Sequence, residues 1–394
     1  MKLFLKIFLW AVIIIVLISL IPYIISPAYE FDDPSPFKGS SLYNPYKDIQ
    51  NNNWYKANLH SHSDVWGNLA DGRSSTPEAI HKVYSDMDYD IIGISNYMNL
   101  NVTDSHKDKL FPVYEHGFGI WKNHYLVVGA DDISLIDFVY YPTLNNKQFL
   151  INLLKTENNL ISIVHPWMRN AVSLNDVAYL DNYDCIEICR YSRTSVEYVD
   201  KALSSGKSIK LIANDDSHNI NDQDEIGKGL TIINSKSKSY DDLISAVRQG
   251  SAVSVNLIKS GFNSFELKNY NITRLPNLIR FDVTGDSISL AFDSVAAKIK
   301  FIGQDGVMKS IVPNTYEAAY TFKNDDSYIR VETEFSSNAI YYLNPVYRYD
   351  SLYSKTYTAK INYPLSVIYY VLWISGIIIV VLIYKRKIYR KNNL

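Results

Sequence analysis

The first and last parts of the chain are long apolar runs without a charged residue. Twenty-three such residues separate Lys6 from Glu30, and twenty-four separate Lys360 from Lys385. A run of this length can cross the roughly 30 Å hydrocarbon layer of a bilayer as one helix. Each run therefore predicts a membrane-spanning helix.

The two predicted transmembrane helices occupy residues 1–28 and 364–385. The first run also fits a cleaved signal peptide, because Ser26 and Ala28 are small residues suitably placed for cleavage. Its apolar stretch is long for a signal peptide, so we favour an uncleaved anchor. A buried core helix fits both runs less well, because cations flank them.

Cations near the two runs predict their orientation. Lys2 and Lys6 precede the first run, and the tail 386–394 after the second is basic. Cytoplasmic segments next to membrane spans carry an excess of Lys and Arg. We expect both termini in the cytoplasm and the large middle part outside it, on a bacterial or archaeal cell membrane with the lipid bilayer as a partner.

Short apolar runs alternate with helical patterns across residues 54–258. Runs that are apolar at nearly every position are typical of parallel strands covered on both faces. Repeated alternation of this kind predicts an α/β barrel or an open parallel sheet. The predicted strands are 54–60, 89–95, 125–130, 160–165, 185–189, 209–214 and 229–234. The predicted helices are 76–87, 147–157, 195–205 and 239–249.

The pattern changes in residues 259–349, where strand candidates follow one another without helices between them. Asp305-Gly306 lies between two of these candidates as a hairpin signal. We expect a small antiparallel β-sandwich here. Residues 29–53 and 350–363 are then linkers between the middle part and the predicted spans.

Composition narrows the classes of function. The 394 residues carry a net charge of −2, with 47% hydrophobic and 20% charged residues, so the chain is neither disordered nor a disulfide scaffold. Without the seven cations that flank the apolar runs, 32 basic and 41 acidic residues remain, a net charge of −9. Such an acidic middle part repels phosphate backbones, so no nucleic acid is expected as a partner. Cys185 and Cys189 alternate with apolar residues and are expected in the core.

Polar residues follow the predicted strands. In an α/β barrel the carboxyl ends of the strands form one face, where the chemistry lies, so residues far apart in the sequence can meet in one pocket. In an extended chain, side chains two positions apart point to the same side. His60 and His62 have this spacing, and so do Asp216 and His218. The residues in question are His60, His62, Asn96, Tyr97, Asp131, Asp132, His165, Asp216 and His218.

Imidazole and carboxylate groups gathered in this way predict a metal site. Zn, Mn and Fe accept these ligands, and the lack of thiolates argues against a structural zinc site. Loop histidines and strand-end caps remain the alternative for any single member. Of the other histidines, His81 is expected to be exposed on a helix, and only His124, beside a strand, is placed to approach the pocket.

Four segments carry most of these residues in a fixed order, and a fifth segment follows them. They are NLHSHSDVWGNLADGRSSTPEAI, VVGADDIS, LISIVHPW, NDDSHN and LISAVRQGSAVSV. In order and spacing they resemble the motifs of the polymerase and histidinol phosphatase (PHP) superfamily, and the later YYLNPVY resembles the end of membrane-associated or secreted members with a β-sandwich after the barrel. The resemblance covers roughly residues 54–346.

This resemblance implies a distorted seven-stranded (β/α)7 barrel that holds up to three metal ions for phosphoester hydrolysis. It implies catalytic roles for Asp131 as the bridging carboxylate and for Asp216 or His218 in proton relay. Arg169 or Arg190 would hold a phosphate oxygen. The implied metal ligands are His60, His62, Asp71, Asp131, His165, Asp216 and His218.

The sequence departs from the family pattern at two places. The T-D-H step is replaced by Ser95-Asn96-Tyr97, so a tyrosine stands where a histidine is expected. The histidine that often follows the G-x-E glutamate by some ten residues has no counterpart after Asp131, where Tyr140 and Tyr141 stand. We therefore expect one or two divalent ions per chain instead of three.

The function expected from these residues is a membrane-anchored, metal-dependent phosphoesterase acting on a small phosphorylated substrate outside the cytoplasm. One alternative is a degenerate binding or sensor module of the same fold with a weakened metal site, which Tyr97 favours. The other is a metallohydrolase of amide or carbamate bonds, whose usual lysine between metals has no evident place in this sequence.

Overall fold

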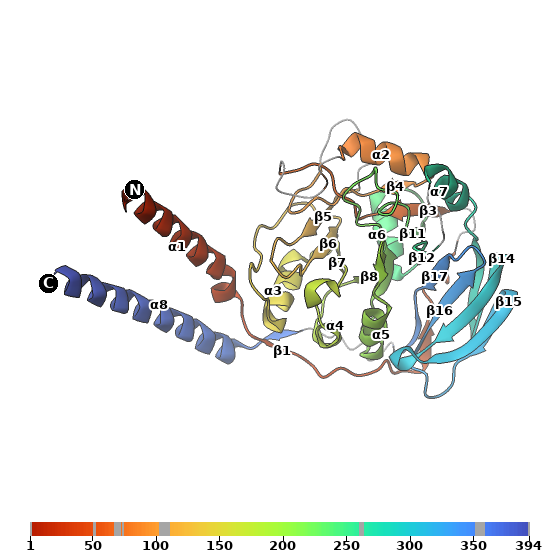
Figure 1. Cartoon of the computed structure of the whole chain (residues 1–394). Helices are drawn as coiled ribbons and strands as arrows, with labels where there is room; N and C mark the ends of the chain where they lie inside the picture. The colour runs from red at the N-terminus through yellow and green to blue at the C-terminus, as the bar shows by residue number, and fades with distance from the viewer. Residues whose placement is uncertain are drawn as a thin grey trace.

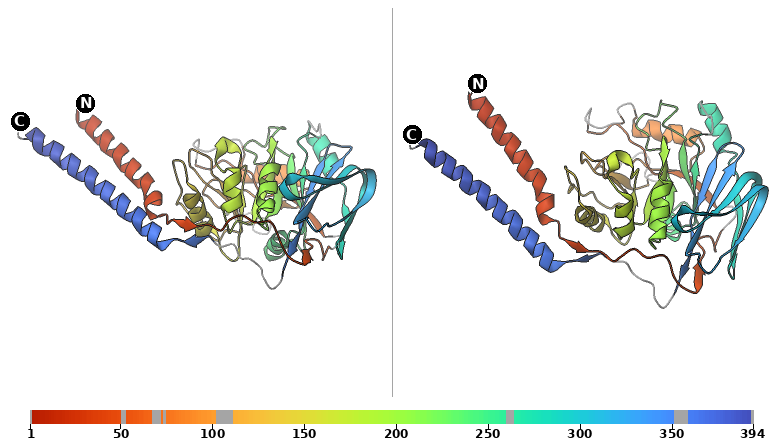
Figure 2. Two further views of the ribbon diagram at one scale, coloured as in Figure 1. Left: turned by 90° about the horizontal axis from the view of Figure 1, so that it is seen from below. Right: turned by 60° about the horizontal axis from the view of Figure 1, so that its bottom comes forward.

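A computed structural model describes residues 2–49, 53–66, 72, 75–101, 111–259, 264–350 and 359–392. It consists of a mixed α/β body with one long apolar helix at each end of the chain (Figure 1). Both helices leave the body on the same side, and the N- and C-termini lie at their far ends in all views (Figure 2).

The two apolar helices are α1 (Lys2–Ile25) and α8 (Tyr363–Asn392). Leu3–Ile25 and Tyr363–Lys387 are long and apolar enough to cross a membrane, and almost none of their surface is buried in the protein. The Trp10 and Tyr384 rings meet edge to face at 6.1 Å, so the helices contact each other. The two candidate spans are confirmed as exposed apolar helices, while their orientation stays a prediction.

The bases of these helices are joined to each other where they meet the body. Strand β1 (Tyr29–Glu30) pairs antiparallel with β19 (Lys360–Ile361). The backbone N–H of Ala28 donates to Ser366 Oγ at 3.0 Å. The chain therefore enters and leaves the body at one place.

One sheet of the body has six described strands in the order β10-β8-β7-β6-β5, with β9 on β8. Strands β7, β8 and β10 are parallel, whereas β6 runs antiparallel to both β5 and β7. Every residue of the five strands on this path is buried. The strands are β5 (Val113–His116), β6 (Tyr125–Val128), β7 (Leu160–Ile163), β8 (Cys185–Arg190), β9 (Arg193–Thr194) and β10 (Lys210–Ala213).

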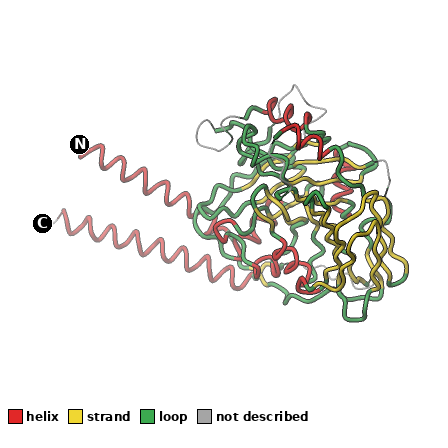
Figure 3. The backbone as a smooth tube through the Cα atoms, turned by 45° about the vertical axis from the view of Figure 1, so that its right-hand side comes forward, coloured by secondary structure: helices red, strands yellow, loops and turns green. Residues whose placement is uncertain are grey.

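The other large sheet has eleven described strands, with the path β13-β14-β16-β17-β12-β11-β3-β4. Many strands of the body lie on the side away from the two terminal helices (Figure 3), and β14, β15, β16 and β17 of this sheet are among them (Figure 1). They are β2 (Ser41–Tyr43), β3 (Trp54–Asn58), β4 (Ile91–Ile92), β11 (Gly229–Asn234), β12 (Ala252–Asn256), β13 (Leu278–Thr284), β14 (Ser287–Ile302), β15 (Met308–Thr321), β16 (Tyr328–Phe335), β17 (Ile340–Leu343) and β18 (Val346–Tyr349).

The predicted closed barrel is wrong, because the described strands of residues 54–258 are divided between these two sheets. Strands β10 and β11 are joined by the hydrogen bonds of a side chain instead of a ladder of backbone hydrogen bonds. Thr231 Oγ1 accepts from the Ala213 N–H and donates to the Ala213 carbonyl oxygen, both at 2.9 Å. Near the site, an isolated bridge between Ser61 and Ser217 connects the two parts.

The late strands of the chain continue the sheet of the earlier ones. Strand β17 pairs with β12 from Val253↔Leu343 to Asn256↔Ile340, so no break in hydrogen bonding separates the two regions. The β-sandwich and the domain boundary at residue 258 both stay predictions from sequence.

Helices cover the sheets with capped ends. Thr76 caps α2 by accepting from the Ala79 N–H, with Pro77 in the first turn. His81 on α2 is buried, contrary to expectation, because it lies on the helix face that packs inward with Ile80 and Tyr84. The helices are α2 (Pro77–Asp86), α3 (Leu144–Leu154), α4 (Leu174–Tyr179), α5 (Val196–Ser204), α6 (Tyr240–Gln249), α7 (Phe265–Ile272) and the 3₁₀ turns η3 (Met168–Asn170) and η4 (Gln304–Gly306).

Candidate metal site

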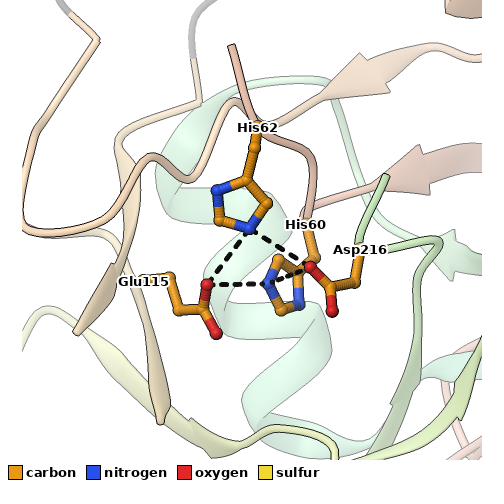
Figure 4. A group of neighbouring side chains, drawn as sticks. All are labelled: His60, His62, Glu115 and Asp216. Atoms are coloured by element: carbon orange, nitrogen blue, oxygen red, sulfur yellow. Dashed lines mark hydrogen bonds and ion pairs between the residues drawn. The ribbon is translucent and has the colours of Figure 1, made fainter. Parts of the chain in front are cut away.

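Four buried side chains from three parts of the chain meet in one cluster (Figure 4). His60 and His62 follow β3, Glu115 lies on β5, and Asp216 follows β10. The His62 Nε2 atom is 3.1 Å from Glu115 Oε2 and 3.2 Å from Asp216 Oδ1. The His60 Nε2 atom is 3.4 Å and 3.2 Å from the same two oxygens. We call these four residues the first metal group.

The other oxygen of Glu115 faces a second cluster. Glu115 Oε1 is 2.6 Å from His124 Nδ1 and 3.0 Å from His165 Nε2. Glu115, His124 and His165 are all buried, and we call them the second metal group. One carboxylate thus belongs to both groups, each oxygen serving one of them.

The spacing of these atoms suits metal ions. Four ligand atoms about 2.0–2.2 Å from one tetrahedral ion lie about 3.3–3.6 Å from one another. The first metal group comes close to that spacing, and its His60 Nε2 and Glu115 Oε2 are buried without a hydrogen-bond partner. Buried polar atoms are normally paired, so buried ligand atoms that face each other without a hydrogen bond are suited to holding a shared cation. Imidazole and carboxylate ligands of this kind suit Zn, Mn or Fe.

Backbone strain accompanies two members of the site. His165 and Asp216 have φ values of 29° and 53°, in the left-handed region that residues other than glycine rarely adopt. Such conformations cost on the order of 1–3 kcal/mol each and persist where the surroundings enforce them. Here they turn both side chains back toward Glu115 at the ends of β7 and β10.

Glu187 on β8 orients the first metal group from outside. Its Oε1 lies 2.9 Å from His60 Nδ1, and its Oε2 accepts from the backbone N–H of His165 at 3.2 Å. Asn214 Nδ2 also donates to Oε1 at 3.1 Å. A proton on His60 Nδ1 is therefore held by Glu187, which leaves Nε2 as the atom that faces Glu115 and Asp216.

The electrostatics of the cluster are those of a cation site. Burial alone would lower the pKa of His60, but Asp216, Glu187 and Glu115 together raise this pKa well above its ordinary value. Burial would raise the pKa of Glu115 and Asp216, yet both carboxyls have a pKa well below the usual range, Glu115 because of His124 and His60 and Asp216 because of His60 and Arg190. Buried carboxylates therefore stay charged and draw positive charge to this place.

Arg190 reaches the edge of the cluster. At the end of β8, its Nε donates to Asp216 Oδ2, and the side chain is buried. The guanidinium lies 4.4 Å above the Tyr191 ring and 6.0 Å from that of Trp167. Arg169, the other arginine predicted for substrate binding, is exposed, and its Nη1 donates to the Ile120 carbonyl oxygen at 2.6 Å. The structure thus brings Arg190, and not Arg169, into contact with the metal groups.

Most of the predicted ligands come together. His60, His62, His165 and Asp216 lie in the two metal groups. His218 is close by: its Nε2 is 3.3 Å from Asp216 Oδ1, and its ring stacks on that of His62 at 4.4 Å. Asp71 lies outside the described residues.

Asp131, predicted as the bridging carboxylate, is not in the cluster. It is exposed beyond the end of β6, and Glu115 has the position between the two histidine groups. The physical reason is strand direction. Because β6 runs antiparallel to β7, its carboxyl end points away from the site and its amino end, with His124, points toward it.

Sequence reasoning missed Glu115 and Glu187 and left His124 undecided. A signal for two of them was present: Glu115 and His124 are nine residues apart, close to the glutamate–histidine spacing that was sought after Asp131. The Tyr140 and Tyr141 pair therefore does not stand in place of a lost histidine.

Tyr97 lies beside the first metal group. Its ring stacks on the His62 ring at 4.5 Å, and its backbone bridges to Glu115. The preceding Asn96 is buried, and its Oδ1 accepts from the Ser63 N–H at 2.8 Å, which fixes the turn after His62. The tyrosine thus packs against a candidate ligand from the position where a histidine was expected.

Comparisons with known proteins add little to this geometry. No family model matches the chain, and no curated protein does. One similar solved structure is a two-domain protein from Bacteroides vulgatus that contains a predicted PHP-like metal-dependent phosphoesterase. Its sequence identity to this chain is 13%, the match covers 78% of this chain and 96% of that one, and the TM-score is 0.39. Another is PsfC from Pseudomonas syringae, with 13% identity, coverage of 57% and 99%, and a TM-score of 0.36. At these values the assignment of the site depends on its own residues.

Proposed function

We propose that this chain is a metal-dependent phosphoesterase with two metal ions that share Glu115. The observation that carries the proposal is the division of this one carboxylate. Its Oε2 faces His60, His62 and Asp216, and its Oε1 faces His124 and His165. A carboxylate with one oxygen in each group can bridge a pair of metals a few ångströms apart, and such pairs are suited to displacement at phosphorus.

Bound metal ions would polarise the phosphoryl oxygens and lower the pKa of a water molecule. The chain's own residues supply the rest. Arg190 holds Asp216 in place and offers a guanidinium to a phosphate oxygen at the rim of the cluster. His218 is less buried than the ligands and lies beside Asp216, so it is placed to pass a proton between the site and solvent.

The proposal is tested with the full chain purified in detergent. Metal content is measured first, then hydrolysis of 4-nitrophenyl phosphate and bis(4-nitrophenyl) phosphate with and without a chelator. We expect hydrolysis of at least one ester, its loss on chelation and its recovery with Zn²⁺ or Mn²⁺. Asp216→Asn should lower the rate at least about 100-fold, whereas Asp131→Asn, a matched change of an exposed acid, should leave it unchanged.

A binding or sensor module is the second candidate, because Tyr97 stacks on His62 where a histidine was expected. The same preparation distinguishes the two candidates. Stoichiometric metal without hydrolysis of either ester would favour the binding module, and protein without bound metal would contradict both the metal groups and the phosphoesterase.

A further inference from the structure

The segment that links Glu115 to His124 is unusually apolar for a surface loop. Phe118, Ile120 and Trp121 are 54%, 55% and 39% exposed. Isolated exposed apolar residues are ordinary, but several within four positions form a patch that usually marks a contact surface. This loop leads directly from the shared carboxylate to a ligand of the second metal group.

A second segment extends the patch. The Ile120 N–H donates to the Val139 carbonyl oxygen at 3.0 Å, and the Trp121 and Tyr141 rings meet edge to face at 5.2 Å. Tyr140 and Tyr141 are 40% and 48% exposed. We call Phe118, Ile120, Trp121, Tyr140 and Tyr141 the aromatic lip.

The aromatic lip lies against the last turns of α1. The Tyr140 N–H donates to Tyr23 Oη at 2.8 Å, and the Ser19 and Tyr140 hydroxyls are 3.4 Å apart. The Tyr23 ring also packs edge to face on Phe138 at 4.8 Å. If Leu3–Ile25 crosses the bilayer, residues 19–23 lie within one to two turns of its end, at the depth of the lipid headgroups.

We propose that the aromatic lip inserts into the headgroup region of the membrane that α1 and α8 cross, and that the metal site therefore acts on a phosphoester carried by a lipid. The substrate class rests on the proposed phosphoesterase function and on the two predicted spans. Tyr and Trp are the residues enriched at this depth of a bilayer. Two cations near the lip add positive charge suited to lipid phosphates. They are Lys122, which follows Trp121, and the exposed Arg169, which donates a hydrogen bond to the Ile120 carbonyl oxygen.

The position of the lip explains why a lipid fits this site. Only two residues, His116 and Gly117, lie between Glu115 and Phe118 in the chain, so the inserted surface begins next to the metal groups. A lipid whose phosphate reaches Glu115 can leave its acyl chains in the bilayer. A soluble substrate would gain nothing from an apolar rim at this place.

Insertion is measured without any turnover. Ile120→Cys in the full chain is labelled with the fluorophore NBD, since both native cysteines are buried, and reconstituted in phosphatidylcholine vesicles that contain doxyl-labelled lipid. We expect quenching at position 120. The matched control is Tyr316→Cys, an exposed residue on β15, on the side of the body away from α1 (Figure 1), where no quenching is expected. Equal quenching at the two positions, or none at position 120, would overturn the insertion.

The substrate class is measured with pairs of esters that share a headgroup. Phosphatidic acid in vesicles is compared with glycerol 3-phosphate, and phosphatidylinositol with glycerophosphoinositol. We expect kcat/KM to favour the lipid of the hydrolysed pair by at least about tenfold, and Phe118→Ser with Ile120→Ser to reduce that ratio by a similar factor. The control Ile311→Ser with Tyr316→Ser, on β15, should keep the ratio.

The outcomes separate the two proposals. Equal or faster hydrolysis of the soluble member would overturn the lipid substrate while leaving the phosphoesterase intact. No hydrolysis of any pair by metal-loaded protein would count against the phosphoesterase, and the quenching result would still decide whether the lip contacts the membrane.

Discussion

The two metal groups share Glu115 but differ in charge. The first has a second carboxylate, Asp216, and its His60 is also bonded to Glu187. The second has only the shared Glu115 and two histidines, of which His124 has a pKa lowered by burial despite the nearby glutamate. The protein thus surrounds one place with more negative charge than the other.

This difference implies different affinities for the two ions. A divalent ion in the first metal group is attracted by more carboxylate charge than one in the second. The attraction is strong because the environment is buried. We therefore expect a tightly held first ion and a second ion that exchanges more readily. The four predictions below test that ranking.

The largest effect is expected from the residue that the two groups share. Glu115→Gln removes the charge that both ions need while keeping the shape of the side chain, so both should be lost and hydrolysis should fall about 1,000-fold or more. Metal analysis of the purified variant measures this. A variant that still holds two ions would show that Glu115 does not bridge.

Removing histidines should separate the groups. His60→Ala with His62→Ala should remove most bound metal, because the first group keeps only carboxylates. His124→Ala should lower the content from two ions to one, and only the weakly held one should disappear. Titration with a chromogenic chelator resolves tight and weak ions. The ranking fails if His124→Ala releases the tight ion.

A smaller effect is expected from Glu187, which contacts no ion but orients His60. Glu187→Gln should weaken the first ion about 10–100-fold, since partners of metal-ligating histidines have effects of this size. Competition with a chelator of known affinity measures the change. The second ion serves as the internal control, and equal weakening of both ions would indicate a general loss of structure.

The smallest effect concerns Tyr97. A neutral phenol is a poor ligand, with an ordinary pKa of about 10, so we expect no more than two tightly bound ions in the native protein. Tyr97→His should raise metal occupancy, because it places an imidazole beside His62 and His218. Tyr97→Phe is the control and should leave occupancy unchanged. Three stoichiometric ions in the native protein, or no gain in the histidine variant, would contradict this role.

Much of the site could be predicted because its residues follow apolar strands. His165 and Asp216 each come shortly after a fully buried strand, and His60 follows a strand whose last two residues are buried, so that rule found them. The rule failed at β6, which runs antiparallel to its neighbours on both sides, β5 and β7. Asp131, at the carboxyl end of β6, was therefore predicted as a ligand in error, and His124, at its amino end, was not predicted as one. Strand direction depends on pairing between distant segments, which no local pattern reveals.

Glu115 was missed for a different reason. Its strand β5 is four residues long and reads Val-Tyr-Glu-His, and both of its polar residues are buried. A short polar stretch predicts a loop. Similarly, the apolar strands alone favoured a barrel, and they do not reveal that β10 and β11 lie in different sheets, joined there by the hydrogen bonds of the Thr231 hydroxyl to Ala213.

The short β1–β19 pair has a consequence for how the protein can be rebuilt. Because Tyr29 lies opposite Ile361, the body is an insert between two helices, with its entry and exit side by side. A domain with adjacent ends can be inserted into another protein, or its two ends can be joined and the chain opened at another loop to give a circular permutant. The same closure lets the body be cut from its helices and sealed by a short linker, giving a form without the two apolar segments in which the contacts of Ser19 and Tyr23 with Tyr140 and Phe138 are lost.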